Sequence, residues 1–184
     1  MIIIFIFNFS WYIHDWLIYF PELSEHYWHD FYKNASQDIW NNRHNYEKIY
    51  FTNTDTQPYI FFAWYNQIEP SLIQQQTHNR DDELVEGIKQ IDNIYFWDVK
   101  PHTTPCYLLQ PQSLVVASHN DPDVLPNDIF PPHFVYTREN RFHHGDIALR
   151  AWESEKLTDK QKKILLNLCP QPSEIIPNNM KKNK

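Results

Sequence analysis

Apolar side chains gather first at the N-terminus. Residues 2–13 form an almost unbroken run, IIIFIFNFSWYI, and a second aromatic patch, WLIYF, ends at Pro21. The unbroken part is shorter than the roughly 20 residues that a membrane-spanning helix needs, and no signal-peptide features accompany it. We therefore expect residues 1–21 to be a truncated last transmembrane helix whose upstream half lies outside this sequence; a buried core helix is the alternative. Interfacial rings are expected at Trp11, Tyr12, Trp16 and Tyr19.

Three further segments have a helical pattern. From Ser24 to about His44, aromatic residues recur among polar ones without Pro or Gly, which predicts an amphipathic helix. Pro58 suits a first helical turn and opens the aromatic run 59–65. Residues 82–90 also have a helical pattern. We expect these segments to flank a sheet.

Short apolar runs predict the strands of that sheet. The runs 48–53, 93–98 and 113–118 predict buried strands separated by helical material, as in a parallel layer. Residues 133–137 and 146–152 alternate with period two around a turn that contains glycine, which predicts a hairpin. The segment from Pro122 to Pro132 is expected to be a loop.

The fold predicted from these patterns is α/β, with a small mixed sheet of about five strands flanked by helices. Residues 22–156 would form this domain, after the membrane remnant at 1–21. Residues 157–184 would form a C-terminal helix, capped by Thr158 or Asp159, and a disordered tail.

Composition excludes several classes of function. The formal net charge is -7 and no interior stretch is basic, which argues against nucleic acid as a partner. Because Gly87 and Gly145 are the only glycines, neither a GxGxxG nor a GxxxxGK phosphate loop exists, and we expect no cofactor. Cys106 and Cys169 are compatible with one disulfide in an oxidising compartment or with two unpaired thiols.

Several blocks in order carry a resemblance to a known family. Phe20-Pro21, Trp28 and Trp40 precede YEKIYFTNTDTQPYIFFAWYNQIEP (residues 46–70), which NIYFWDV, SLVVAS and the closing hairpin follow. Together they resemble the C-terminal region of membrane glycosyltransferases that use polyprenyl-phosphate sugars, related to dolichyl-phosphate-mannose protein mannosyltransferases and aminoarabinose-lipid transferases. The resemblance covers roughly residues 2–153, and residues 46–70 are its most specific part.

The resemblance implies an accessory domain on the extracytoplasmic side of the cell membrane. Such a domain would cover the active-site cavity or contact a lipid-linked sugar or glycan acceptor. In that family an acidic residue in a loop near the N-terminus of the enzyme serves the reaction, and nothing here matches that loop. No catalytic residue is therefore transferred, and we expect the fragment to be inactive alone. A stand-alone membrane-anchored or soluble binding domain without enzymatic activity is the alternative.

The predicted strand ends place a candidate pocket. Ligands of α/β sheets tend to bind at the carboxyl ends of the strands, which selects Thr52, Asn53, Asp98 and Ser118. The segment 118–121 contains the residue types of a hydrolase triad, but consecutive residues cannot orient one another in that way. We interpret it as a strand end that enters a loop.

Histidines and aromatic residues give two sharper alternatives. His26 with His29, and His143 with His144, are spaced as ligand pairs, so a small metal-dependent hydrolase is a third hypothesis. The HExxH arrangement is absent, and we expect no metal. The aromatic run 59–65 predicts a helix packed on the sheet, with a carbohydrate-stacking surface as the alternative.

Overall fold

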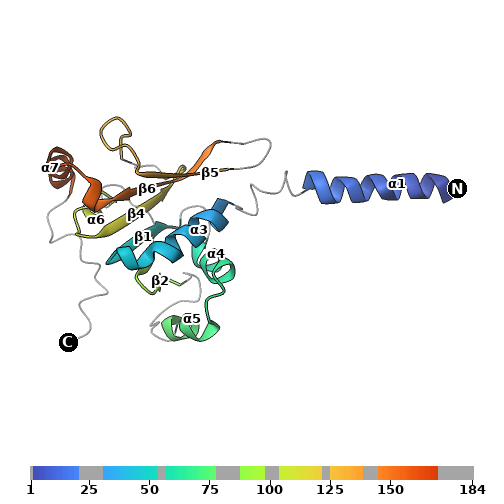
Figure 1. The fold of residues 1–184 in the computed structure, drawn as a ribbon, viewed down its shortest axis with the longest axis horizontal. Helices are drawn as coiled ribbons and strands as arrows, with labels where there is room; N and C mark the ends of the chain where they lie inside the picture. The colour runs from blue at the N-terminus through green and yellow to red at the C-terminus, as the bar shows by residue number, and fades with distance from the viewer. Residues whose placement is uncertain are drawn as a thin grey trace.

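The structure, a computed structural model, describes residues 2–20, 31–53, 57–77, 88–97, 104–121, 125–138 and 145–169 (Figure 1). Its helices are α1 (Ile2–His14), α3 (Phe31–Asn42), α4 (Pro58–Tyr65), α5 (Pro70–Thr77), α6 (Thr104–Tyr107) and α7 (Asp159–Leu168), with the short helical turns η1 (Asp15–Tyr19), η2 (Arg43–Asn45) and η3 (Ser154–Lys156). Its strands are β1 (Lys48–Thr52), β2 (Gln90–Ile91), β3 (Ile94–Trp97), β4 (Ser113–Ser118), β5 (Phe134–Thr137) and β6 (Ile147–Glu153).

The six strands form one mixed sheet in the order β2-β3-β1-β4-β6-β5. Strand β1 lies between β3 and β4 and is parallel to both, whereas the other three pairings are antiparallel. The predicted α/β class, the mixed sheet and the closing hairpin are confirmed. The predicted number of about five strands is too low by one, because the two-residue strand β2 begins at Gln90, where a helix was expected.

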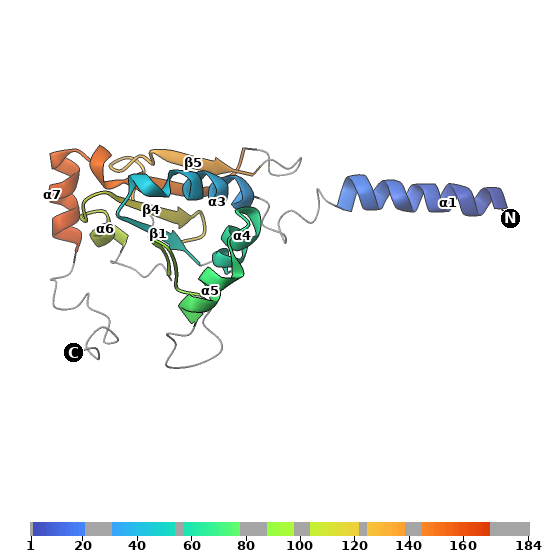
Figure 2. The same cartoon turned by 60° about the horizontal axis from the view of Figure 1, so that its bottom comes forward.

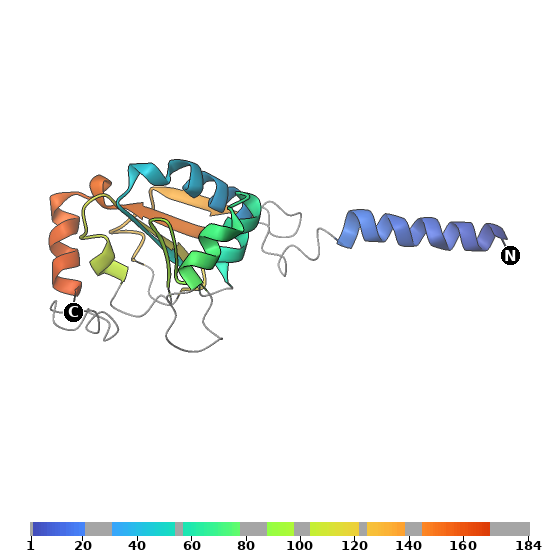
Figure 3. The ribbon, with the colours of Figure 1, turned by 90° about the horizontal axis from the view of Figure 1, so that it is seen from below.

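The central strands β1 and β4 are buried on both faces, which explains their unbroken apolar runs. Alternate residues of β1 and β4 point to opposite faces, so that Ile49 and Phe51 pack under α3 and α4 while Tyr50 and Val115 pack toward α6 and α7. Figure 2 shows α3 and α4 on the first side, and Figure 3 shows α6 and α7 at the end of the domain away from α4.

Local chemistry sets the ends of several elements. Pro58 occupies the first turn of α4, as predicted. Thr158 begins α7 with a capping box, in which its hydroxyl accepts from the backbone N–H of Gln161 and the Gln161 side chain accepts from the backbone N–H of Thr158. Gly145 has a φ of 86° in the turn before β6, a conformation that glycine adopts without strain.

The helix expected from Ser24 to His44 is found as α3, and its first part lies outside the described residues. The prediction for residues 82–87 and the tail after Cys169 also lie outside them. Helices α5 and α6 were not predicted.

Cys106 and Cys169 form a disulfide, with their Cα atoms 5.4 Å apart. The bond joins α6 to the residue that follows α7. The sequence alone left pairing and two unpaired thiols as alternatives, and the structure selects pairing.

The N-terminal helix carries apolar side chains on every side. Helix α1 continues through η1, and none of the residues of α1 is buried. Among the described residues, no helix combines the length and the apolar character needed to cross a bilayer. The predicted transmembrane remnant at residues 1–21 is therefore not supported.

Candidate functional site

The parallel arrangement brings the carboxyl ends of β1 and β4 together. Thr52 ends β1 and Ser118 ends β4, and both residues are buried. The two strands are hydrogen-bonded neighbours that run in the same direction. Two of the four residues predicted from strand ends therefore lie at one edge of the sheet.

Asp121 links these two strand ends. One carboxylate oxygen accepts a hydrogen bond from the Thr52 hydroxyl at 3.3 Å, and the other accepts from the backbone N–H of Ser118 at 2.6 Å. The carboxylate is only 4% exposed. Backbone bonds from Asp121 to the Ser118 carbonyl and from Asn120 to the Ser118 hydroxyl close the turn. We call Thr52, Ser118 and Asp121 the edge cluster.

The edge cluster holds the backbone in place. Its carboxylate is occupied by two donors from the protein, which is how a buried carboxylate is normally stabilised. From the sequence, residues 118–121 are considered as a hydrolase triad and interpreted as a strand end that enters a loop. A serine followed three residues later by an aspartate is also a pattern in which side chains bond to a turn. The contact with Thr52, 69 residues away, had no sequence signal.

Of the two remaining predicted pocket residues, only Asn53 is among the described residues. Asn53 follows β1 directly, and its side-chain Oδ1 is buried without a hydrogen-bond partner. Asp98 lies outside the described residues. Ligand binding at these four residues remains a prediction.

Arg150 and His119 lie beside the edge cluster. Arg150 in β6 is the sheet partner of Ala117 in β4. His119 comes two residues after Ala117, in the turn that follows β4. The backbone N–H of His119 donates to the Ala148 carbonyl, which fixes the turn against β6. A guanidinium nitrogen of Arg150 approaches Nδ1 of His119 at 3.5 Å, and Nε of Arg150 is buried without a partner. Sequence reasoning missed Arg150 because a lone arginine in a strand has no motif.

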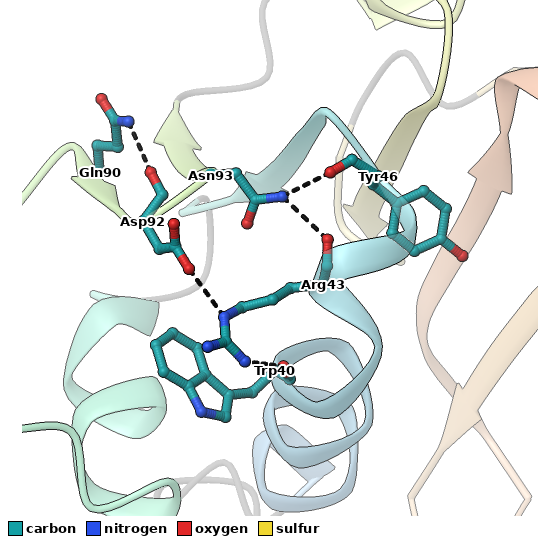
Figure 4. Close-up of polar contacts among 6 residues, drawn as sticks. All are labelled: Trp40, Arg43, Tyr46, Gln90, Asp92 and Asn93. Carbon is teal, nitrogen blue, oxygen red and sulfur yellow. Dashed lines mark hydrogen bonds and ion pairs between the residues drawn. The ribbon is translucent and has the colours of Figure 1, made fainter.

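The opposite edge of the sheet carries a polar cluster with a structural role (Figure 4). Arg43 pairs with Asp92 at 2.8 Å, and its guanidinium stacks on the Trp40 ring and donates to the Trp40 carbonyl. Asn93 donates to the carbonyls of Arg43 and Tyr46. These bonds tie the end of α3 to the turn between β2 and β3. We call this cluster the amino-edge brace.

Tyrosines bonded to carboxylates line the seam between α3 and the hairpin. The Tyr46 hydroxyl donates to Glu153 at 2.8 Å, and the Tyr136 hydroxyl donates to Asp38 at 2.7 Å. Burial and the bonded carboxylate raise the pKa of both phenols. Both therefore stay protonated as donors at neutral pH, which does not suit them to act as general bases.

Helix α4 packs on the sheet, as predicted for the aromatic run 59–65, and a carbohydrate-stacking surface remains a prediction. Phe62 is fully buried and contacts the rings of Phe51 and Phe96. Trp64, on the outer side of the same helix, is 78% exposed, and Ile60 one turn earlier is 49% exposed. The run thus packs on the sheet and also presents an indole to solvent.

The histidine pairs of the metal hypothesis, His26 with His29 and His143 with His144, lie outside the described residues. Within the part of the chain that the structure describes, no group of three His, Cys, Asp or Glu side chains could hold a metal ion. The metal hypothesis gains no support from the described residues.

Comparisons with protein-family models, with curated proteins and with solved structures found no match to this chain.

Proposed function

We propose that this chain is a membrane-associated accessory domain of a glycosyltransferase that moves a sugar from a polyprenyl-phosphate donor, with the catalytic residues in another part of the enzyme. The observation that carries the proposal is the N-terminal helix, which exposes its apolar side chains beside an α/β domain with a core of its own. The resemblance of residues 46–70 and of the element order to that family supplies the reaction class.

The helix needs an apolar environment. The side chain of Ile3 is 82% exposed, that of Phe7 68% and that of Trp11 61%. The other exposed large apolar residues from Ile2 to Phe20 have exposed fractions of at least 50%. A helix that is apolar on all sides is stable when it is buried in protein or lipid, and apolar surface of this extent marks an interaction site. Lipid and the apolar helices of a larger enzyme both meet that need.

Two further features agree with an extracytoplasmic position and a sugar partner. The disulfide between Cys106 and Cys169 is the kind of bond that persists in oxidising compartments. The exposed indole of Trp64 offers a flat amphipathic surface of the type on which sugar rings stack. Both support the proposal without naming the sugar or the acceptor.

The first test is the apparent mass of the native polypeptide in membranes of the source cells, detected with an antibody against residues after Pro21. We expect a membrane-bound band far above 22.4 kDa. A band at 22.4 kDa would contradict the transferase proposal and favour a free-standing binding domain.

A second test measures sugar transfer in those membranes with Trp64→Ala and, as the matched control on the same helix, Ile60→Ala. If Trp64 stacks on the acceptor glycan, its replacement raises the KM for acceptor while Ile60→Ala does not. Equal KM values for wild type and Trp64→Ala would remove Trp64 from the proposal.

A further inference from the structure

We propose that Arg150 and His119 form a binding site for an oxyanion, specifically a phosphate group, at the carboxyl end of β4, where the antiparallel strand β6 begins. The inference goes beyond the proposed function and holds whether or not the chain belongs to a transferase.

The guanidinium of Arg150 lacks a matched acceptor. Among the ion pairs of the described residues, none involves Arg150. Its sheet partners Ala117 and Val135 have no polar side-chain atoms. The contact with His119 is long, at 3.5 Å, and Nε has no partner although it is buried. Nε is closed to solvent, whereas the contact of the terminal nitrogen with His119 is exposed. An external acceptor therefore reaches the guanidinium through its terminal nitrogens.

His119 adds a second donor at the same place. An arginine side chain can only donate, so Nδ1 of His119 is the acceptor in this contact. The imidazole then carries its proton on Nε2, which leaves one N–H for a ligand. A planar guanidinium beside an imidazole N–H matches the several acceptor oxygens of a phosphate group.

The surrounding structure fixes the backbone that carries the two donors. His119 lies in the turn that the edge cluster closes, and its backbone N–H is bonded to β6. Arg150 is in the middle of β6, hydrogen-bonded on both sides to β4 and β5. Little ordering is therefore needed when a ligand binds, which favours affinity.

The net charge of the whole chain argues against nonspecific binding of anions. With a net charge of -7 the chain repels anions in general. Specific anion binding must then come from a local cationic group, and substitution of that group should weaken it strongly.

The test uses the full chain in zwitterionic detergent, with inorganic phosphate titrated in a calorimeter. We expect saturable binding that Arg150→Gln weakens at least about tenfold, the effect of losing one charge-assisted hydrogen bond or more. Arg150→Lys should give an intermediate loss, because it keeps the charge and loses the planar fork. His119→Ala should also weaken binding, by a smaller factor.

The matched control is Arg138→Gln, which removes the same charge just after β5, where Arg138 lies over the Phe31 ring. It should leave phosphate binding unchanged. Thermal unfolding of each variant separates loss of binding from loss of folding, and Arg150→Lys keeps the test valid if Arg150→Gln does not fold.

Vesicles distinguish the source of the phosphate. Wild-type chain is floated with phosphatidylcholine vesicles that contain or lack phosphatidic acid, so that the apolar helix contributes equally to both. A preference for phosphatidic acid that Arg150→Gln abolishes, without binding of inorganic phosphate, identifies a lipid headgroup; binding of inorganic phosphate identifies a soluble ligand. Absence of both, or equal losses in Arg150→Gln and Arg138→Gln, would overturn the inference.

Discussion

Asp121 shows how one buried side chain organises an edge of the sheet. Its carboxylate receives the Thr52 hydroxyl and the Ser118 backbone N–H, so it connects β1, β4 and the turn that positions His119. A buried charge is tolerated when such donors surround it, and its removal leaves those donors without partners. The edge cluster therefore has a stabilising role that its position at the strand ends does not by itself disclose.

Replacing Asp121 by Ala should lower the free energy of unfolding by about 3 kcal/mol, because two hydrogen bonds to a buried carboxylate are lost. Urea unfolding measures the change. The control variant Asp128→Ala removes an exposed carboxylate in the following loop. It should change the free energy of unfolding by less than about 0.5 kcal/mol. Similar stabilities for the two variants would show that Asp121 does not stabilise the edge.

His133 gives the domain a pH dependence. Burial lowers the pKa of His133 below 6.5, Glu153 opposes this, and Lys156 adds to the lowering. Its Nδ1 accepts the backbone N–H of Glu153, which only the neutral ring can do. Because the unfolded chain then binds more protons below pH 6.5, the contribution of His133 is present at neutral pH and is lost as the pH falls through the folded pKa.

We therefore expect unfolding free energies measured at about pH 7.5 and about pH 5.5 to differ more for wild type than for His133→Asn. Asparagine retains an acceptor for the Glu153 N–H and does not titrate. An equal pH slope in the two proteins would exclude His133 as the source.

At the scale of the elements, the amino ends and the carboxyl ends of the parallel strands have different roles. The amino-edge brace uses its side-chain donors internally and joins α3 to the β2–β3 turn (Figure 4), although Oδ1 of Asn93 is buried without a partner. The carboxyl edge carries Arg150, His119 and Asn53 with unmet hydrogen-bonding capacity. Ligand binding is expected at the second edge, as in other α/β sheets.

Asn93→Ala should destabilise the domain by about 2 kcal/mol, since the Tyr46 carbonyl loses the Asn93 donor and the Arg43 carbonyl keeps only the backbone N–H of Tyr46. Chemical denaturation measures the loss. Asn42→Ala is the matched control, because the Asn42 side chain bonds only to Asp38 of its own helix at an exposed site. If both variants lose the same amount, the brace has no special role.

At the scale of the whole molecule, the disulfide and the N-terminal helix differ in how they are joined to the rest of the protein. The disulfide closes a long loop, with a sequence separation of 63 between Cys106 and Cys169. It anchors α7, whose Leu165 is fully buried on the face of the sheet that α6 and α7 cover, to α6. The helix α1, by contrast, buries none of its residues.

Reduction of the disulfide should lower the stability of the domain by about 2–4 kcal/mol, in keeping with the closure of a loop of this length. Thermal unfolding with and without a reducing agent measures the effect. The double variant Cys106→Ser with Cys169→Ser should match the reduced wild type and should not respond to the reductant. A wild-type transition that reduction leaves in place would contradict the prediction.

Much of the secondary structure could be predicted because it rests on local physics. Strands β1, β3 and β4 are buried on both faces and therefore appear as unbroken apolar runs. Helix α4 begins at a proline and α7 at a threonine cap, which are signals within a few residues of the element. Strand β2 was missed because two residues carry no periodicity, and only pairing with β3 makes them a strand.

The candidate site could be predicted only as far as the sheet edge. Thr52 and Ser118 were identifiable as strand ends, and parallel strands place such ends together. The bond from Thr52 to Asp121 and the contact of Arg150 with His119 join residues 69 and 31 positions apart. Such distant pairs depend on which strands become neighbours, which no local pattern encodes.

The sequence by itself thus determined the α/β class, the principal strands, the caps and the apolar N-terminus, because each follows from side chains close together in the chain. Only the tertiary structure decided the strand order, the pairing of Cys106 with Cys169, the partners of Asp121 and the contact of Arg150 with His119. Those depend on long-range packing, in which the order of the strands in the sheet sets which side chains meet.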